Sequence, residues 1–460
     1  MAKLKTQKTI SIEERLEAAL VPENEQPYEV PENWCWVKLG CLYEVNPKND
    51  ADDDVEASFI PMEQIEAGMV SAFTYDINVW GKIRKGHTQF ADGDVAFAKI
   101  SPCFENRKSM LLKGLVNGIG AGTTELIVLR QLAVNPKYTF WIVSNEDFIR
   151  GGCATYSGTV GQQRISMDYV RNYPIPFPPL AEQRRIVERI ESLFSKLDEA
   201  RDKAQEALNG FETRKVAILH DAFSGKLTEH WRSSKGIDMS SWGKIALKDC
   251  GDWFGGGTPN TNNKEYWDNG TIPWVTSKDM KVMRIDDSQL HITRKGVDNS
   301  SANYCDKPAV LFVMRSGILR RIFPVCMINI PFTVNQDLKA IIPKGIEQEY
   351  LYWVCTGYEK DIRDNCMKDG TTVESVEAKK LMAYQIPLAT SDEQREIVRI
   401  IDKLMEKEEQ TREVAEEVIF NIEALKKSIL AKAFRGELGT NNPEEESAIE
   451  LLKQVLETKE

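Results

Sequence analysis

The sequence predicts an α+β protein in which two globular domains are joined by two long antiparallel coiled-coil helices with internal pseudo-two-fold symmetry. Three observations support this prediction: the chain repeats itself, each copy ends in a long heptad pattern, and each copy contains short strand-like runs. A chain of 460 residues, of which 42% are hydrophobic, is also long enough for two separately cored domains.

A repeat with a constant offset of 211 residues links the two halves of the chain. The segment that begins at Ile175-Pro176 returns at Ile386-Pro387, and the match continues without a gap until Ala222-Phe223 meets Ala433-Phe434. Weaker matches precede each copy in the same order. The predicted segments are an N-terminal helical segment at 1–30, a first globular domain at 31–178, a first long helix at 179–232, a second globular domain at 233–388, a second long helix at 389–438 and a C-terminal helical tail at 439–460.

The two long segments are predicted to be helices because their apolar positions follow a 4,3,4,3 heptad rhythm. Each pattern extends over 33 residues, which corresponds to roughly 50 Å of helix. Neither helix can bury its apolar stripe alone, so we expect them to pack on each other, with Gly225 and Gly436 as helix terminators. Ordinary packing without function is the alternative, but the equal lengths favour helices that set a distance. The predicted seam residues are Ile186, Ile190, Leu193, Leu197, Phe211, Ile218, Ile397, Ile401, Leu404, Val418, Ile422, Leu425 and Ile429.

The shorter elements are predicted from local patterns. Apolar runs bounded by Gly, Pro and Asp are typical of strands. Two short amphipathic segments, at 12–20 and 447–456, are predicted to be helices, and their apolar faces suggest the hypothesis that they dock on the coiled coil. The predicted strands lie at 94–100, 125–130, 309–314 and 338–342.

Composition excludes several classes of protein. The apolar stretches are too short to span a membrane, and the first thirty residues contain no apolar core of a secretory signal. The nine cysteines include no Cys-x-x-Cys, and the four histidines have no ligand spacing, so neither a disulfide framework nor a metal site is expected. These features predict a cytoplasmic protein without a membrane partner.

The charge is distributed unevenly along the chain. The formal net charge is −11, but residues 386–460 carry −7 of it, whereas residues 231–385 carry +2. An acidic protein does not attract phosphate from a distance, so any contact with DNA must be local and geometrically placed.

Motifs that would support catalysis in this chain are missing. No Gly-Lys pair continues as a phosphate-binding loop, and no Asn/Asp-Pro-Pro-Tyr/Phe of an amino-methyltransferase occurs. The glycine-rich run 118–122 lacks the complete Gly-x-Gly-x-x-Gly pattern and leads into a predicted strand. Residues 377–379, Glu-Ala-Lys, would supply only half of a nuclease site. We therefore expect no catalytic residue, metal or cofactor in this chain, and a self-contained methyltransferase is excluded.

The second globular domain contains a specific series of motifs. It begins with Gly255-Gly256-Gly257-Thr258-Pro259 and continues through Ile272-Pro273-Trp274 to Lys278-Asp279-Met280. Together with Gly158-Thr159-Val160 and the repeated helical blocks, this order resembles the specificity (S) subunit of type I restriction-modification systems, with two target recognition domains. The first domain departs from the pattern, because it has Val45-Asn46-Pro47-Lys48 near the position of the Gly-Gly-Thr-Pro opening.

The resemblance implies a non-catalytic subunit that directs a multi-subunit adenine DNA methyltransferase and type I restriction endonuclease. Each recognition domain would read one half of a bipartite site in double-stranded DNA, and the helices would set the spacing and dock the methyltransferase subunits. The implied partners are two modification (M) subunits, which bring S-adenosylmethionine, and restriction (R) subunits, which use ATP with Mg.

Candidate DNA-binding residues are polar side chains suited to base edges or phosphates. Lys99 and Arg315 follow matched strands, and three of the candidates follow a Gly-Thr turn, so these rank slightly above the others. Each candidate has an alternative role as an ordinary solvated side chain. The full set is Lys82, Arg84, Lys85, Lys99, Arg107, Lys108, Gln162, Gln163, Arg164, Thr258, Lys278, Lys281, Arg284, Arg294, Lys295, Arg315, Arg320 and Arg321.

Two alternatives remain open. In the alternative interpretation, the chain is a protein–protein scaffold with two globular ends and a coiled-coil spacer, and it binds no DNA. The net charge of −11 favours this alternative. The repeated tryptophans Trp34, Trp141, Trp242 and Trp353 are either base-stacking platforms or core residues, and their recurrence with the scaffold favours the core.

Overall fold

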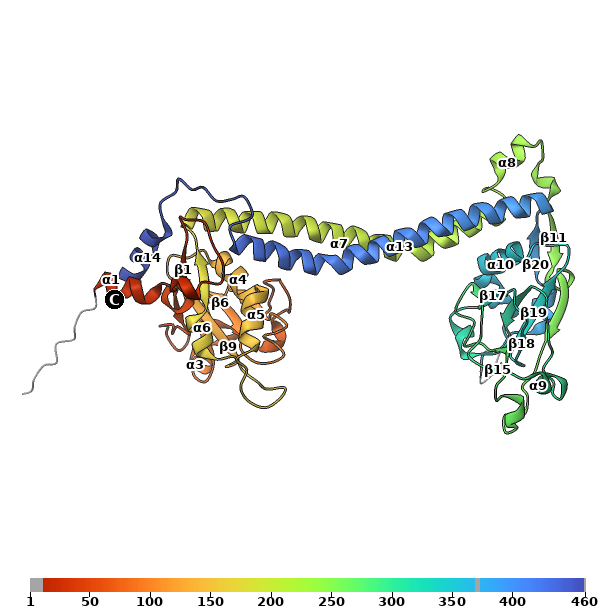
Figure 1. Ribbon diagram of the computed structural model, residues 1–460, viewed down its shortest axis with the longest axis horizontal. Helices are drawn as coiled ribbons and strands as arrows, with labels where there is room; N and C mark the ends of the chain where they lie inside the picture. The colour runs from red at the N-terminus through yellow and green to blue at the C-terminus, as the bar shows by residue number, and fades with distance from the viewer. Residues whose placement is uncertain (1–10, 369–372, 459–460) are drawn as a thin grey trace, which may run out of the picture. The chain divides into compact units, whose positions relative to one another are not determined.

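The computed structural model describes residues 11–368 and 373–458. Three of the predicted segments therefore extend beyond the described residues, at 1–10, 369–372 and 459–460. The chain divides into two compact units, the first formed by residues up to Ala204 together with those from Glu417 onward, and the second by Gln205–Glu416. The long helices α7 (Leu180–Phe223) and α13 (Ser391–Phe434) contribute one part to each unit (Figure 1).

Unit 1 contains the first globular domain, built from two four-stranded sheets and one two-stranded ribbon. The sheets have the strand orders β2-β9-β6-β7 and β4-β3-β8-β5, and the ribbon pairs β1 with β10. All pairs are antiparallel except β3 with β8. The elements are β1 (Cys35–Lys38), α2 (Leu39–Leu42), β2 (Tyr43–Val45), β3 (Glu56–Ile60), β4 (Asp76–Val79), α3 (Trp80–Ile83), β5 (Thr88–Ala91), β6 (Val95–Ala98), β7 (Ser109–Leu111), β8 (Ile119–Gly122), β9 (Leu126–Gln131), α4 (Pro136–Ser144), α5 (Glu146–Cys153), α6 (Met167–Asn172) and β10 (Pro174–Phe177).

Unit 2 contains the second globular domain, which has a five-stranded sheet β12-β19-β16-β17-β14, a three-stranded sheet β15-β13-β18 and the ribbon β11-β20. The elements are α8 (Glu229–Ser234), β11 (Gly243–Ala246), β12 (Gly251–Gly255), β13 (Ile272–Val275), β14 (Arg284–Ile285), β15 (His291–Ile292), α9 (Arg294–Asp298), β16 (Ala309–Val313), β17 (Val325–Ile328), β18 (Thr333–Val334), β19 (Leu338–Pro343), α10 (Gln348–Gly357), α11 (Glu359–Cys366), α12 (Ala378–Ala383) and β20 (Gln385–Leu388).

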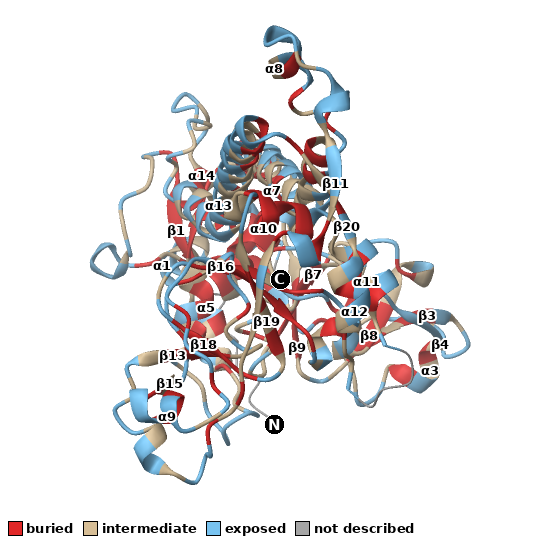
Figure 2. Ribbon diagram, turned by 90° about the vertical axis from the view of Figure 1, so that its right-hand side faces the viewer, coloured by how far each residue is buried: buried red, intermediate tan, exposed pale blue. Residues whose placement is uncertain are grey.

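The two units repeat one scaffold, as the sequence repeat predicts. The ribbon β1-β10 pairs Val37 with Ile175, and the ribbon β11-β20 pairs Ile245 with Ile386. The four predicted strands are confirmed as β6, β9, β16 and β19. Their continuous apolar runs place them in the core, where every residue of β16 is buried (Figure 2).

The paired parts of α7 and α13 are antiparallel within each unit. In unit 1, Lys426 Nζ lies 2.8 Å from Asp198 Oδ1. In unit 2, Arg214 Nε lies 2.8 Å from Glu408 Oε2. The earlier part of α7 therefore lies beside the later part of α13 in unit 1, and the reverse holds in unit 2.

The predicted seam is wrong at one position. Leu425 is 48% exposed, and its neighbour Lys426 is buried in its place. Ile186, Ile190, Ile397, Ile401 and Ile422 are buried, whereas Leu193, Leu197, Phe211, Ile218, Leu404, Val418 and Ile429 are partly buried. A straight helix has 3.6 residues per turn, so the buried stripe drifts away from a strict 3.5-residue heptad by about 20° per heptad.

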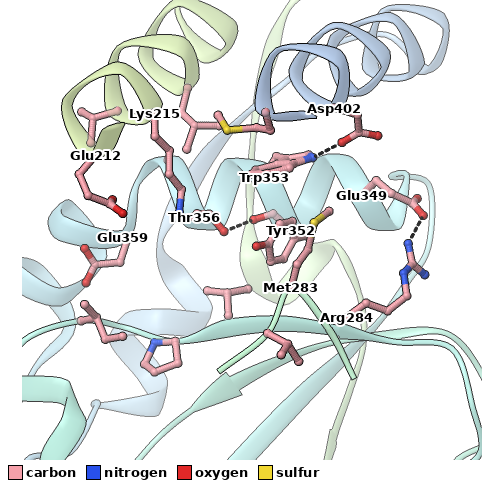
Figure 3. A pocket seen from close by; sticks show the side chains of 18 of the residues that line it. Glu212, Lys215, Met283, Arg284, Glu349, Tyr352, Trp353, Thr356, Glu359 and Asp402 are labelled. Atoms are coloured by element: carbon pink, nitrogen blue, oxygen red, sulfur yellow. Dashed lines mark hydrogen bonds and ion pairs between the residues drawn. The ribbon is translucent and has the colours of Figure 1, made fainter. Parts of the chain in front are cut away.

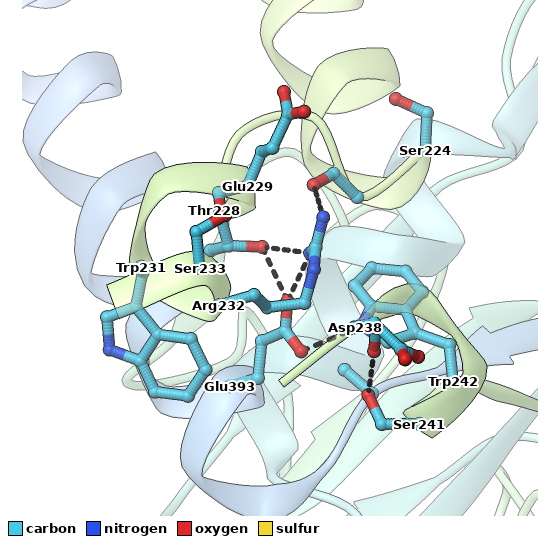
Figure 4. Close-up of polar contacts among 12 residues, drawn as sticks. Ser224, Thr228, Glu229, Trp231, Arg232, Ser233, Asp238, Ser241, Trp242 and Glu393 are labelled. Carbon is cyan, nitrogen blue, oxygen red and sulfur yellow. Dashed lines mark hydrogen bonds and ion pairs between the residues drawn. The ribbon is translucent and has the colours of Figure 1, made fainter. Parts of the chain in front are cut away.

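A glycine lies two residues beyond the end of each long helix, and a short segment then returns to the start of the other long helix. Gly225 has φ +82° and Gly436 has φ +74°, a left-handed conformation that favours glycine after a helix. Beyond Gly225, Thr228 Oγ1 donates to Glu393 Oε1 at 2.6 Å, and Arg232 Nη1 donates to the same oxygen at 2.5 Å (Figure 4). Trp242 Nε1 donates to the other carboxylate oxygen at 2.8 Å.

Unit 1 contains the counterpart of this network around Glu182, which corresponds to Glu393 at the offset of 211. Beyond Gly436, Thr440 Oγ1 donates to Glu182 Oε1 at 2.7 Å. Arg185 pairs with Glu182 at 2.6 Å and with Glu445 at 2.7 Å. Both networks thus hold a buried glutamate in the first turn of a long helix.

The short terminal helices are α1 (Ile12–Ala19) and α14 (Ala448–Glu457), close to the predicted 12–20 and 447–456. The hypothesis that they dock on the coiled coil stays a prediction, although residues of α14 share one buried core with Ile186 and Phe434 of the long helices. They pack on each other, and α14 also packs on α2 of the first globular domain. Leu452, Val455 and Leu456 enter a core that includes Trp34.

Within the described part of the chain, no helix combines the length and apolarity needed to cross a bilayer. All nine cysteines are free thiols.

Candidate nucleic-acid interface

In unit 1, the loop between α5 and α6 is joined to the end of β6 by backbone hydrogen bonds. The N–H of Ile165 donates to the carbonyl of Lys99 at 3.0 Å, and the N–H of Ser101 donates to the carbonyl of Gln163 at 2.8 Å. The N–H of Lys99 donates to the carbonyl of Glu125 at 2.8 Å. Lys99 and Gln163 are therefore held close together, although more than sixty residues separate them in the sequence.

In unit 2, two equivalent bonds join the loop between α11 and α12 to the end of β16, and a third joins the end of β16 to the residue before β19. Val376 N–H donates to Met314 O at 2.8 Å, Ser316 N–H to Glu374 O at 3.0 Å, and Met314 N–H to Asp337 O at 2.7 Å. The backbone scaffold is thus the same in both units. Some of its side chains are alike, such as Glu125 and Asp337, whereas Lys99 and Gln163 correspond to Met314 and Glu374.

In unit 1, an ion pair fixes the base of the loop. Arg164 donates to both carboxylate oxygens of Glu125, from Nε at 2.8 Å and from Nη2 at 2.7 Å. The adjoining guanidinium lowers the pKa of Glu125 below its usual value. The tip turns through Gly158 (φ +111°) and Gly161 (φ +84°), which leaves Val160 95% exposed. Gln162 is also exposed.

In unit 2, the corresponding cations are held less firmly. Arg315 Nε lies 3.9 Å from Asp337 Oδ1, and the Arg315 side chain is mostly exposed. Arg320 Nε donates to Glu374 Oε1 at 2.7 Å. Arg315 is therefore held less firmly than Arg164 of unit 1.

The glycines of the Gly255–Pro259 motif are required by close packing. A Cβ at Gly256 would lie 2.0 Å from Val334 O, and one at Gly257 would lie 2.0 Å from Ser301 Oγ. The next residue, Thr258, donates from Oγ1 to Gln336 Oε1 at 2.5 Å. This motif thus brings Thr258 beside the turn that leads into β19.

The other candidates are dispersed over both domains, and most of the arginines have intramolecular partners. Arg107 is largely buried, pairs with Glu146 and donates from Nε to Ser144 O at 3.1 Å, which is a structural role. Lys108 Nζ donates to Met62 O at 2.8 Å. Ion pairs join Arg84 with Asp53, Arg284 with Glu349, Arg294 with Asp298 and Lys295 with Glu265. Among the described residues, no ion pair involves Lys82, Lys85, Lys99, Lys278, Lys281 or Arg321.

The tryptophans belong to the scaffold, which confirms the core interpretation. Trp34, Trp141 and Trp353 are buried. Trp242 is partly buried and donates to Glu393.

The sequence-based candidates do not include Glu125 and Asp337, because their carboxylates are acceptors and the candidate DNA contacts are donors and cations. Their matched positions in the repeat were the available signal.

Lowering the pH is expected to release the unit 1 loop. The pKa of Glu125 is lowered in the folded state, so the ion pair stabilises the fold above the usual carboxyl pKa. That stabilisation is lost as the pH falls through the lowered value. Amide hydrogen exchange in residues 157–165, corrected for intrinsic rates, should rise on acidification and in Glu125→Gln at neutral pH. Asp147→Asn, which removes the exposed Arg150 pair, is the matched control; equal exchange in both variants would contradict the assignment.

A family model described as the type I restriction modification DNA specificity domain matches residues 31–208 and 239–418. The chain is 39% identical over 218 residues to the Type I restriction enzyme EcoAI specificity subunit of Escherichia coli, a match that covers 46% of this chain and 37% of that protein. It is 40% identical over 158 residues to the Type I restriction enzyme EcoR124I/EcoR124II specificity subunit of Escherichia coli, covering 34% of this chain and 39% of that protein. The matches thus span well under half the length of these two relatives.

The fold is similar to the crystal structure of the HsdS subunit from Thermoanaerobacter tengcongensis. The TM-score is 0.69 at 21% sequence identity, and the match covers 89% of this chain and 99% of that chain.

Proposed function

Because this chain belongs to the type I restriction modification DNA specificity family, we propose that it is the non-catalytic subunit that directs an adenine methyltransferase and endonuclease assembly to a bipartite site in double-stranded DNA. The domains at 31–178 and 233–388 act as target recognition domains, and each reads one half of the site. The long helices set the spacing of the two halves and dock two modification subunits.

The observation that carries this proposal is the recurrence of one loop scaffold with unlike side chains. The equivalent backbone bonds lie beside exposed Gln162 on the loop of unit 1 and beside exposed Arg315 at the end of β16 in unit 2, so the two units present different side chains from different parts of the scaffold. Gln pairs best with adenine and Arg with guanine in the major groove, so different side chains on one scaffold suit two different half-sites. Loops on a rigid scaffold are also the usual place for recognition.

The chemistry is assigned to partner subunits. No group of three or more metal-ligating side chains lies together in the part of the chain that the structure describes. The modification subunits bind S-adenosylmethionine, restriction subunits bind ATP with Mg, and the assembly works in the cytoplasm. Since the chain carries a net charge of −11, its partners also supply much of the attraction for phosphate.

Sequencing of methylated DNA tests the proposal. Cells that express the chain with its modification subunit should carry a split adenine-methylated motif, and cells with residues 433–460 deleted should lack it. The purified chain alone should transfer no methyl group. If the subunits associate but no motif is methylated in either strain, the protein–protein scaffold becomes the better account.

Binding to duplex DNA at increasing salt separates that scaffold from the proposal. Phosphate contacts give an affinity that falls steeply with salt concentration, whereas a scaffold without a DNA site gives no binding at any salt concentration.

Substitution of Gln162 tests base readout directly. Gln162→Ala should relax discrimination at one position of one half-site, at a cost of about 1–3 kcal/mol, and leave the other half-site unchanged. Methylation rates on a library of sites measure both effects. Gln205→Ala, an exposed glutamine on α7, is the matched control, and an equal change in both half-sites would contradict a local contact.

A further inference from the structure

Unit 1 contains a cavity of about 420 Å³ where the end of α13 meets the first globular domain. Its walls are largely aromatic: Trp36 and Phe434 are buried, and Tyr28, Tyr169 and Tyr173 are partly buried. All of its lining residues belong to unit 1. The volume lies in the usual range for small-molecule sites, roughly 300–1,000 Å³, and aromatic walls suit a planar ligand that packs against the rings.

The cavity contains polar groups that the protein leaves without partners. Asn145 lies between α4 and α5, is 6% exposed and lines the cavity. Its side chain does not cap α5, and it makes no hydrogen bond to any described residue. The hydroxyls of Tyr28 and Tyr173, which also line the cavity, have no hydrogen-bond partner in the described part of the chain. Since a buried amide without a partner is costly, a ligand that bonds Asn145 would be stabilised there.

The unpaired hydroxyl of Tyr173 is specific to unit 1. α5 and α11 align over their full length without a gap, which places Phe148 opposite Asp361. In unit 2, Tyr384, the counterpart of Tyr173 at the offset of 211, donates to Asp361. In unit 1, the ring of Phe148 packs edge-on against that of Tyr173, with the centroids 4.9 Å apart. Burial raises the pKa of Tyr173, so its hydroxyl stays protonated and can donate to a ligand.

The charged residues that line the cavity favour an anion. They are Asp147, Arg150 and Arg435. Arg150 Nη2 lies 2.8 Å from Asp147 Oδ1, so these two charges balance each other. Arg435 is exposed, its guanidinium carbon lies 5.2 Å from the centre of the Tyr28 ring, and it has no ion pair with any carboxylate of the described residues. One cation is therefore left for an anionic group of a ligand.

The larger cavity of unit 2, of about 950 Å³, is less suited to such a ligand (Figure 3). Several of its polar groups already bond one another, because Trp353 Nε1 donates to Asp402 Oδ1 at 2.9 Å and Arg284 Nη2 donates to Glu349 Oε1 at 3.3 Å. It also lies along the long helices, where the modification subunits are proposed to dock. The cavity of unit 1, in contrast, is lined only by the last residue of α13 and the residue that follows it, together with residues outside the long helices.

We propose that the cavity of unit 1 binds an adenine nucleotide, with one site per chain. The adenine ring packs against the aromatic walls. The Asn145 amide bonds the exocyclic amino group and the adjacent ring nitrogen, as an Asn amide does when it reads adenine in DNA. The phosphate pairs with Arg435.

Other classes of small ligand fit these groups less well. A cation would meet the uncompensated charge of Arg435, and an apolar ligand would leave the Asn145 amide without a partner. The adenine nucleotide satisfies both groups. Its binding requires neither DNA nor a modification subunit, so the site goes beyond the proposed function and does not depend on it.

Isothermal titration calorimetry of the full-length chain with adenosine monophosphate is the test. Adenosine monophosphate should bind at one site per chain. Ribose phosphate, which lacks the base, and adenosine, which lacks the phosphate, should each bind at least about tenfold more weakly. Inosine monophosphate should also bind more weakly, because it has a carbonyl in place of the amino group that donates to Asn145.

Two variants separate the contacts of the base from those of the phosphate. Arg435→Ala should weaken binding of adenosine monophosphate at least about tenfold, since a hydrogen-bonded charge is lost. Asn145→Ala should abolish the preference for adenosine monophosphate over inosine monophosphate. Arg184→Ala is the matched control, because Arg184 is an exposed arginine of unit 1 that does not line the cavity. Circular dichroism checks that the variants are folded.

Each contrary result overturns a stated part of the proposal. Absence of binding to the wild-type chain removes the site, and equal binding of ribose phosphate reduces it to a contact with an anion. An unchanged preference over inosine monophosphate in Asn145→Ala removes the base contact, and equal weakening by Arg184→Ala removes the phosphate contact. If adenosine monophosphate does not bind but the chain still directs methylation, this inference fails and the proposed function stands.

Discussion

Glu393→Ala is expected to lower the free energy of unfolding of unit 2 by about 3–5 kcal/mol, the usual cost of breaking a buried ion pair. Glu393 is fully buried, and the Arg232 side chain is only 5% exposed. Removing the carboxylate leaves the Arg232 guanidinium buried without its counterion. It also removes the acceptor of Thr228 Oγ1 and Trp242 Nε1. Hydrogen exchange measured by mass spectrometry, with peptides assigned to each unit, gives the loss for unit 2 alone.

Glu396→Ala is the matched control on the same helix. Glu396 pairs with Arg399, whose side chain is 62% exposed, so its loss should cost at most about 1 kcal/mol. The double variant Arg232→Met, Glu393→Leu should recover part of the stability, because it removes both charges but leaves Thr228 Oγ1 and Trp242 Nε1 without their acceptor. Equal losses in Glu393→Ala and Glu396→Ala would show that the network does not stabilise the fold.

The long helices were predictable because a heptad stripe reports local geometry. Their exact buried face was not, as the contrast between Leu425 and Lys426 shows. From the sequence alone, a lysine is not expected in the apolar seam between the long helices, because an unpaired buried charge is costly. In the structure, Lys426 bonds Asp198 and lies 5.2 Å from the centre of the Phe194 ring. Both partners are on α7, so only the packed pair of helices reveals the compensation.

The strands of the candidate interface were predictable, but its contacts were not. β6 and β16 are continuous apolar runs, which indicate buried strands. The loops beside them are held by bonds between residues distant in sequence, such as Ser101 and Gln163. A cationic cluster likewise does not reveal which member is paired: Arg107 is a structural cation, whereas Lys99 has no ion pair among the described residues.

Removal of residues 440–460 is expected to destabilise unit 1 by about 5 kcal/mol or more. The deletion withdraws Leu452, Val455 and Leu456 from a core shared with Trp34, and each buried apolar side chain contributes about 1.5–3 kcal/mol. It also removes Thr440, which donates to the buried Glu182. Thermal unfolding monitored by hydrogen exchange should show early opening of unit 1 with little change in the globular domain of unit 2.

A point variant separates core packing from loss of the whole tail. Leu452 is fully buried, so Leu452→Ala should cost about 2–5 kcal/mol through lost burial and the cavity left behind. Gln454→Ala, two residues away on the exposed face of α14, should change stability by less than about 0.5 kcal/mol. If both variants are neutral while the deletion destabilises unit 1, the polar bonds around Glu182, and not the apolar face of α14, carry the stabilisation. Methylation gives a second readout of Leu452→Ala. If methylation is lost while the modification subunit still associates fully without DNA, the defect lies in the first recognition domain, because α14 packs on α2 at the entry to that domain.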